Sequence, residues 1–175
     1  MKVSILIILT SFLVAGDIKI TCEEHLFNLY PKNRDIRMHI FQLDKQIKNK
    51  VENIVKQRFY KDKLYYWTIA QGDSTKAYAF LDNVIGKSMP ITFMVILNID
   101  GEIENVNVIK YREAYGGEVG NKGWLRQFIN LNNNSGYNIG KDIDGISGAT
   151  ISVKSMSKGI YKIAALYPLI RNQLK

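Results

Sequence analysis

Two hydroxyl-bearing residues and two small residues, Ser147-Gly148-Ala149-Thr150, form the stretch of this chain best suited to hold a phosphate. A helix is predicted from about Thr150, because apolar residues recur there at helical spacing: Val153, Met156, Ile160, Ile163, Ala164 and Tyr167. The N-terminus of a helix offers unpaired N–H groups and a partial positive charge, which favour phosphate binding. Gly148 and Ala149 would let a phosphate approach the backbone, and the Thr150 hydroxyl could be esterified. The alternative is a plain helix start, with Ser147 or Thr150 as the N-cap.

The longer segment Asp144-Gly145-Ile146-Ser147-Gly148-Ala149-Thr150 resembles the attachment motif of the FMN-binding domain family, Asp-x-x-Ser/Thr-Gly-Ala-Thr/Ser. That family includes the flavin-bearing subunits of the sodium-pumping NADH:quinone reductase and of the Rnf complex. The resemblance implies that Thr150 carries FMN through a phosphoester, installed by a separate flavin transferase that uses FAD and magnesium. An ionised Asp144 can only accept hydrogen bonds, so we expect it to brace loop N–H groups or assist attachment rather than contact the phosphate.

A second segment, residues 111–128, adds to the resemblance. Glu113-Ala114-Tyr115-Gly116 follows a predicted strand, and Trp124 and Phe128 come next, four residues apart and so on one face of a helical turn. The family commonly has a Glu-x-x-Gly loop and a Trp-x-x-x-Phe segment in this order, before the threonine motif. Its more familiar loop reads Glu-Thr-Pro-Gly, so the contacts of Glu113 and Gly116 with the flavin stay open. Tyr115 and Trp124 are candidates for packing on the flavin. The alternative for Trp124 is that it is a residue of the hydrophobic core.

The resemblance covers roughly residues 75–167, and the surrounding sequence predicts the elements that would position these motifs. Strands are predicted at 64–70, 77–81, 91–98 and 103–111, with turns at 71–74 and 99–102. An amphipathic helix is predicted from Asn33 to near Arg58, on the spacing of Ile36, Ile40, Leu43, Ile47, Val51, Ile54 and Val55. The expected fold is α+β: an antiparallel sheet with one covered face, flanked by an N-terminal amphipathic helix and a C-terminal helix after the Ser-Gly-Ala-Thr motif.

The N-terminus has the pattern of a secretory signal peptide: Lys2, an apolar run, and small residues ending at Gly16. The predicted organisation is a signal peptide at 1–16, an N-terminal lead and amphipathic helix at 17–63, and an FMN-binding domain at 64–175. The protein is therefore expected outside the cytoplasm, in the periplasm or at the cell surface. The stretch 17–31 shows no clear period. Cys22 is the single cysteine, so it can form no internal disulfide, and we assign it no role.

The net charge of +8 comes from scattered basic residues, densest between Lys45 and Lys63 on a predicted helix. We interpret it first as a solvated helix face and second as a docking surface for an acidic partner, and we expect no nucleic-acid binding. The two histidines, His25 and His39, stand alone in the sequence, so no metal site is predicted.

Together these patterns predict an exported flavoprotein that carries electrons as a component of a redox complex rather than as a stand-alone enzyme. The electron donor and acceptor are not identified, and a membrane-bound partner is one option. Whether FMN is covalently attached or only bound is open. The alternative is an exported α+β interaction module without a cofactor. Colour separates the two, because a purified flavoprotein is yellow and the module would be colourless.

Overall fold

The computed structural model describes residues 17–31 and 35–175, so the predicted signal peptide at 1–16 lies outside the described residues. Its centre is one five-stranded antiparallel sheet in which the strands lie side by side in chain order. The strands are β1 (Asp35–Gln42), β2 (Lys63–Gln71), β3 (Ser74–Ile85), β4 (Pro90–Asn98) and β5 (Ile103–Lys110). The four strands predicted from the sequence are confirmed as β2 to β5. The Asp100-Gly101 turn between β4 and β5 is confirmed as well, with Gly101 at φ 90°.

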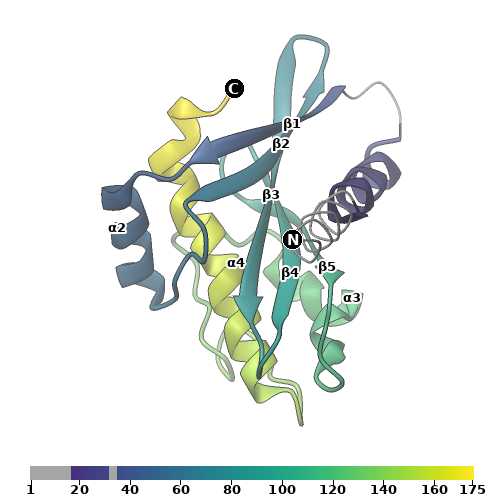
Figure 1. The fold of residues 1–175 in the computed structure, drawn as a ribbon, viewed down its shortest axis with the longest axis vertical. Coiled ribbons are helices and arrows are strands. Elements are labelled where there is room, and N and C mark those ends of the chain that lie inside the picture. The colour runs from purple at the N-terminus through teal and green to yellow at the C-terminus, as the bar shows by residue number, and fades with distance from the viewer. Residues whose placement is uncertain (1–16, 32–34) are drawn as a thin grey trace, which may run out of the picture.

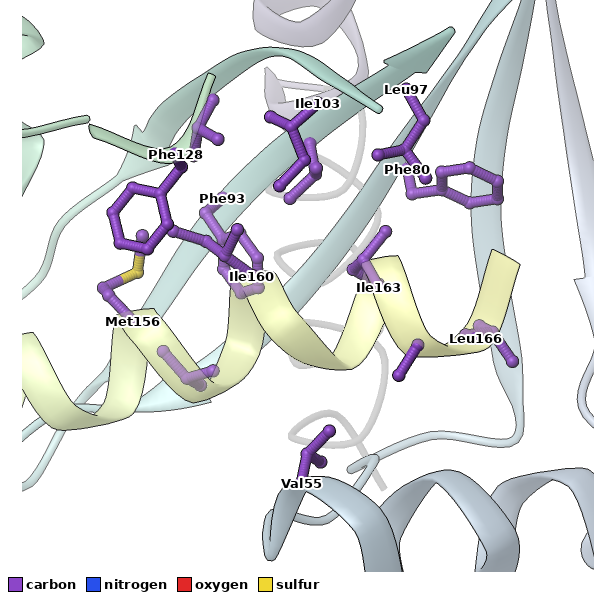
Figure 2. Packing of buried hydrophobic residues seen from close by; sticks show 14 of the residues in the cluster. Val55, Phe80, Phe93, Leu97, Ile103, Phe128, Met156, Ile160, Ile163 and Leu166 are labelled. Carbon is purple, nitrogen blue, oxygen red and sulfur yellow. The ribbon is translucent and has the colours of Figure 1, made fainter. Parts of the chain in front are cut away.

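Helix α4 (Thr150–Ile170) packs on one face of the sheet, and the shorter helix α2 (Lys45–Val55) lies beside it (Figure 1). Alternate strand residues point to opposite faces of a sheet, and the apolar residues on this face meet the apolar side of α4. Figure 2 shows Phe80, Phe93 and Leu97 of the sheet against Ile160 and Ile163 of α4. All six apolar positions that predicted this helix are buried, so the prediction is confirmed.

Residues 17–29 form a further helix, although their sequence shows no clear period. Cys22 and Leu26 are fully buried against the face of the sheet that turns away from α4, together with Trp67, Met94 and Ile96. Both faces of the sheet are therefore covered, not one as predicted. Burial raises the pKa of the Cys22 thiol to about 12, with the Glu23 carboxylate adding to the shift, so this side chain stays an unreactive thiol.

The predicted helix from Asn33 to Arg58 is wrong in its first half. Residues Asp35–Gln42 form strand β1, which pairs along its length with β2, and the helix begins only after Asp44. The Asp44 carboxylate caps it by accepting hydrogen bonds from the backbone N–H groups of Gln46 and Ile47. A spacing of four between Ile36 and Ile40 fits a strand as well as a helix, and pairing with β2 decides between them. The predicted division at residue 63 thus falls between two strands of one sheet.

Short helices and loops connect β5 to α4: η1 (Gly117–Gly120), α3 (Lys122–Leu125), η2 (Arg126–Phe128) and an irregular stretch to Ala149. A last turn, η3 (Arg171–Gln173), follows α4. Among the described residues, no helix has both the length and the apolar character that crossing a membrane would require.

Candidate functional site

A groove of about 720 Å³ lies where the start of α4, the β3–β4 turn and the segment after β5 come together. It brings together six of the nine site residues predicted from the sequence, which come from two segments more than thirty positions apart. These six are Glu113, Tyr115, Gly116, Gly148, Ala149 and Thr150. The other three, Asp144, Ser147 and Trp124, are not among its lining residues.

Thr150 is the first residue of α4 and is exposed on the groove. The N-cap residue is Ala149, which has no side chain able to cap, so the first N–H groups of this 21-residue helix receive no side-chain hydrogen bond. Gly148 precedes them at φ 79°, with open space where a side chain would project. Backbone donors, a helix dipole and free volume therefore meet at the Thr150 hydroxyl. The alternative of Ser147 or Thr150 as the N-cap is wrong.

The loop of residues 111–116 is fastened to the first turn of α4. The Tyr111 hydroxyl donates to the carbonyl oxygen of Tyr115 and lies 3.3 Å from the Ser152 hydroxyl. Gly116 sits between these groups at φ 82°, and a Cβ there would come within 2.8 Å of the Tyr111 oxygen. Only glycine meets both demands. This fastening leaves the Tyr115 side chain 86% exposed at the edge of the groove.

Glu113 organises the β3–β4 turn. Its Oε1 accepts hydrogen bonds of 3.2 Å from the backbone N–H groups of both Ser88 and Met89. Desolvation opposes ionisation of this carboxyl, but the N–H groups of the turn and the charge of Lys87 outweigh it and lower its pKa. The approach is close: a Cβ on Gly86 would lie 2.2 Å from the same oxygen. Glu113 therefore holds one wall of the groove in place.

Two cations on the groove, Lys87 and Arg112, were not predicted as site residues. Lys87 lies in the β3–β4 turn and is exposed, whereas Arg112 is half-buried directly after β5. The Arg112 guanidinium donates through Nη1 to the Pro90 carbonyl and to the Thr92 hydroxyl, both at 2.9 Å. The turn at Gly86–Pro90 can be recognised in the sequence. That it lies at the same end of the sheet as the N-terminus of α4 follows only from the strand order, so the sequence alone did not place these two cations at the site.

Trp124 holds in place the loop that leads to Thr150. Its ring is buried and packs edge-on against Phe128, with ring centroids 5.2 Å apart, as their spacing of four predicts. The indole N–H donates to the Asp144 carbonyl at 2.8 Å, and the Asp144 N–H donates to the Gln127 side chain at 2.8 Å. The Asp144 carboxylate is exposed and makes no hydrogen bond within the described part of the chain. Its bracing role, like the packing of Trp124 on a flavin, stays a prediction.

Comparison with known families indicates which ligand this groove binds. Residues 86–165 match the sequence model of the FMN-binding domain family. This part of the chain is an FMN-binding domain. The match begins at the glycine beneath Glu113 and includes the whole groove. It supports flavin binding over the cofactor-free module. A comparison with curated proteins finds none that matches the chain.

The FMN-binding domain offers a groove that suits a flavin mononucleotide. Small-molecule sites commonly enclose about 300–1,000 Å³, and about 720 Å³ lies within that range. The phosphate dianion suits the uncapped α4 N-terminus and the cations Lys87 and Arg112. Met89, Tyr115 and Ile151 are large apolar residues left exposed on the groove, where a ring system could rest. In residues 17–31 and 35–175, no group of three His, Cys, Asp or Glu side chains gathers as a metal site would require.

Proposed function

We propose that this FMN-binding domain holds FMN covalently through Thr150 and passes electrons between redox partners outside the cytoplasm. The observation that carries the proposal is the exposed Thr150 hydroxyl at the uncapped start of α4, inside the groove. A phosphate esterified there is within reach of the N–H groups of the first turn. It therefore gains hydrogen bonds and the favourable end of the helix dipole without any rearrangement of the helix.

The groove residues divide the work of holding the cofactor. Gly148 leaves space for the phosphate beside the backbone, and Lys87 and Arg112 offset its charge. Tyr111 and Ser152 fix the 111–116 loop against α4, and Glu113 fixes the β3–β4 turn, so both walls are set before the cofactor arrives. When bound, FMN supplies the reversible uptake of electrons, and the protein sets its position and electrostatic surroundings.

The proposed attachment uses a second protein, a flavin transferase, as the family resemblance implies. In the proposed reaction a flavin transferase presents FAD with magnesium. The bond between Thr150 Oγ1 and the FMN phosphorus forms while the FAD pyrophosphate bond breaks. AMP leaves, and the hydroxyl proton passes to the transferase or to water. The exposure of Thr150 supports this, because a buried hydroxyl could not enter another protein's active site.

Export and electron transfer rest on different support. The signal-peptide pattern of residues 1–16 supports export, and a covalent bond suits a compartment in which a lost flavin could not readily be replaced. The family includes flavin-bearing subunits of redox complexes, which supports a role for this protein in carrying electrons.

Substitution of Thr150 tests the attachment. Thr150→Ala, co-expressed with a flavin transferase, should yield protein without flavin fluorescence on a denaturing gel, while Thr150→Ser keeps the hydroxyl and should be labelled at least in part. The fold should tolerate both changes, because an exposed side chain that makes no cap usually alters stability by less than about 0.5 kcal/mol. Intact mass should show the added FMN in wild type and, at least in part, in Thr150→Ser, but not in Thr150→Ala.

Ser147→Ala is the matched control, since Ser147 is also exposed and lies three residues before Thr150 but does not line the groove. It should keep the covalent flavin. Fluorescence that persists in Thr150→Ala and is lost in Ser147→Ala would show that the flavin is attached through an oxygen other than that of Thr150. Wild-type protein that stays unlabelled with a competent transferase would disprove covalent attachment.

A further inference from the structure

A second cavity, of about 530 Å³, lies at the start of β2. Most of its lining residues are on the sheet face that turns away from α4, and Phe59, Leu64 and Asp82 line it from the α4 side. Its lining residues come from the helix of residues 17–29, from strands β1 to β4, from residues 59–61 and from Arg112. Its walls are apolar side chains from four elements, among them Met38, Tyr65, Trp67, Leu81 and Ile85. Apart from Arg112, the flavin groove is lined by other residues, and Pro90 and Thr92 line the cavity where β4 begins.

The apolar walls are left partly open to solvent. Met38, Tyr65, Leu81 and Ile85 are only half-buried, although each is large and apolar and lies in a strand. Covering such surface is favourable, because it removes apolar side chains from water. A concave, mostly apolar space with a few polar groups at one end is the usual form of a site for a small molecule.

The polar end of the cavity consists of Asn83, Thr92 and Arg112. Arg112 Nη1 donates to Thr92 Oγ1 at 2.9 Å, and Thr92 Oγ1 in turn donates to Asn83 Oδ1 at 2.7 Å. This chain fixes the guanidinium in position, and a guanidinium has five N–H donors, so Nη2 and Nε can serve a ligand. Arg112 also lines the flavin groove, which makes it the one residue shared by the two spaces.

The charges around the cavity favour an anion. Three exposed lysines, Lys19, Lys61 and Lys63, line it along with Arg112, and the single acidic lining residue is Asp82. Lys19 lies 3.7 Å from the Glu23 carboxylate, an exposed pair that leaves most of its charge to solvent. The Asp82 carboxylate is buried and neutralised by Lys162 at 2.8 Å. The cavity therefore presents positive charge at one end of an apolar wall.

We propose that this cavity is a second binding site, for an apolar, ring-bearing molecule with a single anionic group. The rings pack against the half-buried Tyr65 and Leu81, and the anionic group binds Arg112. The inference does not depend on covalent flavin attachment, because none of the residues that form the α4 N-terminus line the cavity.

The test uses 8-anilinonaphthalene-1-sulfonate, which has two ring systems and one sulfonate, with flavin-free Thr150→Ala protein as the fluorescence sample. One saturable site should appear. Leu81→Trp, which fills the cavity from β3, should weaken binding at least about tenfold, and Met38→Trp on edge strand β1 should act likewise if Leu81→Trp fails to fold. Ile99→Trp, at the exposed β4–β5 turn, is the matched control and should bind as before.

The anionic group is tested with Arg112→Gln and a neutral analogue, N-phenyl-1-naphthylamine. The substitution should weaken the sulfonate about tenfold and leave the neutral analogue within about twofold. Calorimetry on the flavin-loaded wild type should give the same single site. Binding that does not saturate, wild-type affinity in a folded cavity-filling variant, equal losses of affinity for the two ligands in Arg112→Gln, or complete loss of binding in flavin-loaded protein would each overturn the proposal.

Discussion

Thr150 and Ser152 are two hydroxyl residues of the first turn of α4, and their surroundings separate them. Thr150 is exposed on the groove, whereas Ser152 is 4% exposed and lies 3.3 Å from the Tyr111 hydroxyl. A transferase can reach the first and not the second. In the proposed attachment Thr150 accepts the phosphate, whereas the buried Ser152 holds the loop against α4.

Glu113 gives a prediction about pH. Its pKa is lowered in the folded protein, so the contribution of its ionised form is present above the ordinary value of 4.5 and is lost as pH falls below it. Protonation weakens the hydrogen bonds from the Ser88 and Met89 N–H groups. Amide exchange at these two residues, measured by NMR between about pH 6 and pH 3, should therefore show falling protection.

Glu113→Gln is the control for that prediction, since the amide oxygen can still accept a hydrogen bond but carries no charge. Protection at Ser88 and Met89 should become nearly independent of pH in this variant, after correction for the intrinsic exchange rate. Unchanged protection in wild type down to pH 3 would show that the carboxylate does not hold the turn.

At the scale of elements, the sequence predicted those parts of the molecule in which local pattern and tertiary packing agree. Helix α4 has a strong helical period that its burial repeats, and strands β2 and β4 are runs of apolar and β-forming residues that are mostly buried. Strand β1 was missed because its apolar spacing also fits a helix, and the helix at 17–29 was missed because only a few of its residues, among them Cys22 and Leu26, are buried. Two motif segments were predicted to form one site, and six of their residues do line one groove. Lys87 and Arg112 could not be found locally, since the strand order brings them there.

Helix α4 carries a buried charge that no local pattern indicated. Lys162 is fully buried, with its amine 2.8 Å from Asp82 Oδ2 and 2.8 Å from the Arg58 carbonyl. The same amine lies 4.4 Å from the centre of the Phe59 ring. The pair links α4 to β3 and to the loop after α2. Burial raises the pKa of Asp82 despite the opposing charge of Lys162.

Removing one partner of this pair should be costly. Lys162→Met leaves a buried carboxyl without its cation, so the free energy of unfolding should fall by about 3–5 kcal/mol in urea titrations.

This loss of stability should depend on pH. A carboxyl whose pKa is raised in the folded protein favours the folded state at low pH, so the loss of stability in Lys162→Met should grow as pH rises above about 4. Asp82→Leu combined with Lys162→Met should recover most of the loss and remove its pH dependence. Lys158→Met, exposed on the same helix, should change stability by less than about 0.5 kcal/mol. A small loss in Lys162→Met would mean that the pair contributes little.

At the scale of the whole molecule, two spaces meet at Arg112: the flavin groove at the start of α4 and the apolar cavity at the start of β2. The net charge of the chain is +8. Electron transfer requires a partner to come close to the flavin, so the charge that matters should lie at the groove. Lys87 lies there with the exposed apolar residues Met89, Tyr115 and Ile151. Lys76 is also exposed but lies at the other end of β3, beside the β2–β3 turn.

If an acidic redox partner docks at the groove, reduction of the bound flavin should slow steeply as salt rises. Exposed charges are screened beyond about 10 Å at roughly 0.1 M salt, which removes the long-range attraction that speeds association.

Lys87→Glu should lower the second-order rate constant at low salt by about tenfold or more and flatten its salt dependence, because it reverses a charge at the point of contact. Lys76→Glu makes the same change in net charge and should have a much smaller effect. Stopped-flow reduction at several salt concentrations measures both. A rate independent of salt would make the basic surface incidental to docking, and equal effects of the two variants would show that net charge, rather than the groove, attracts the partner.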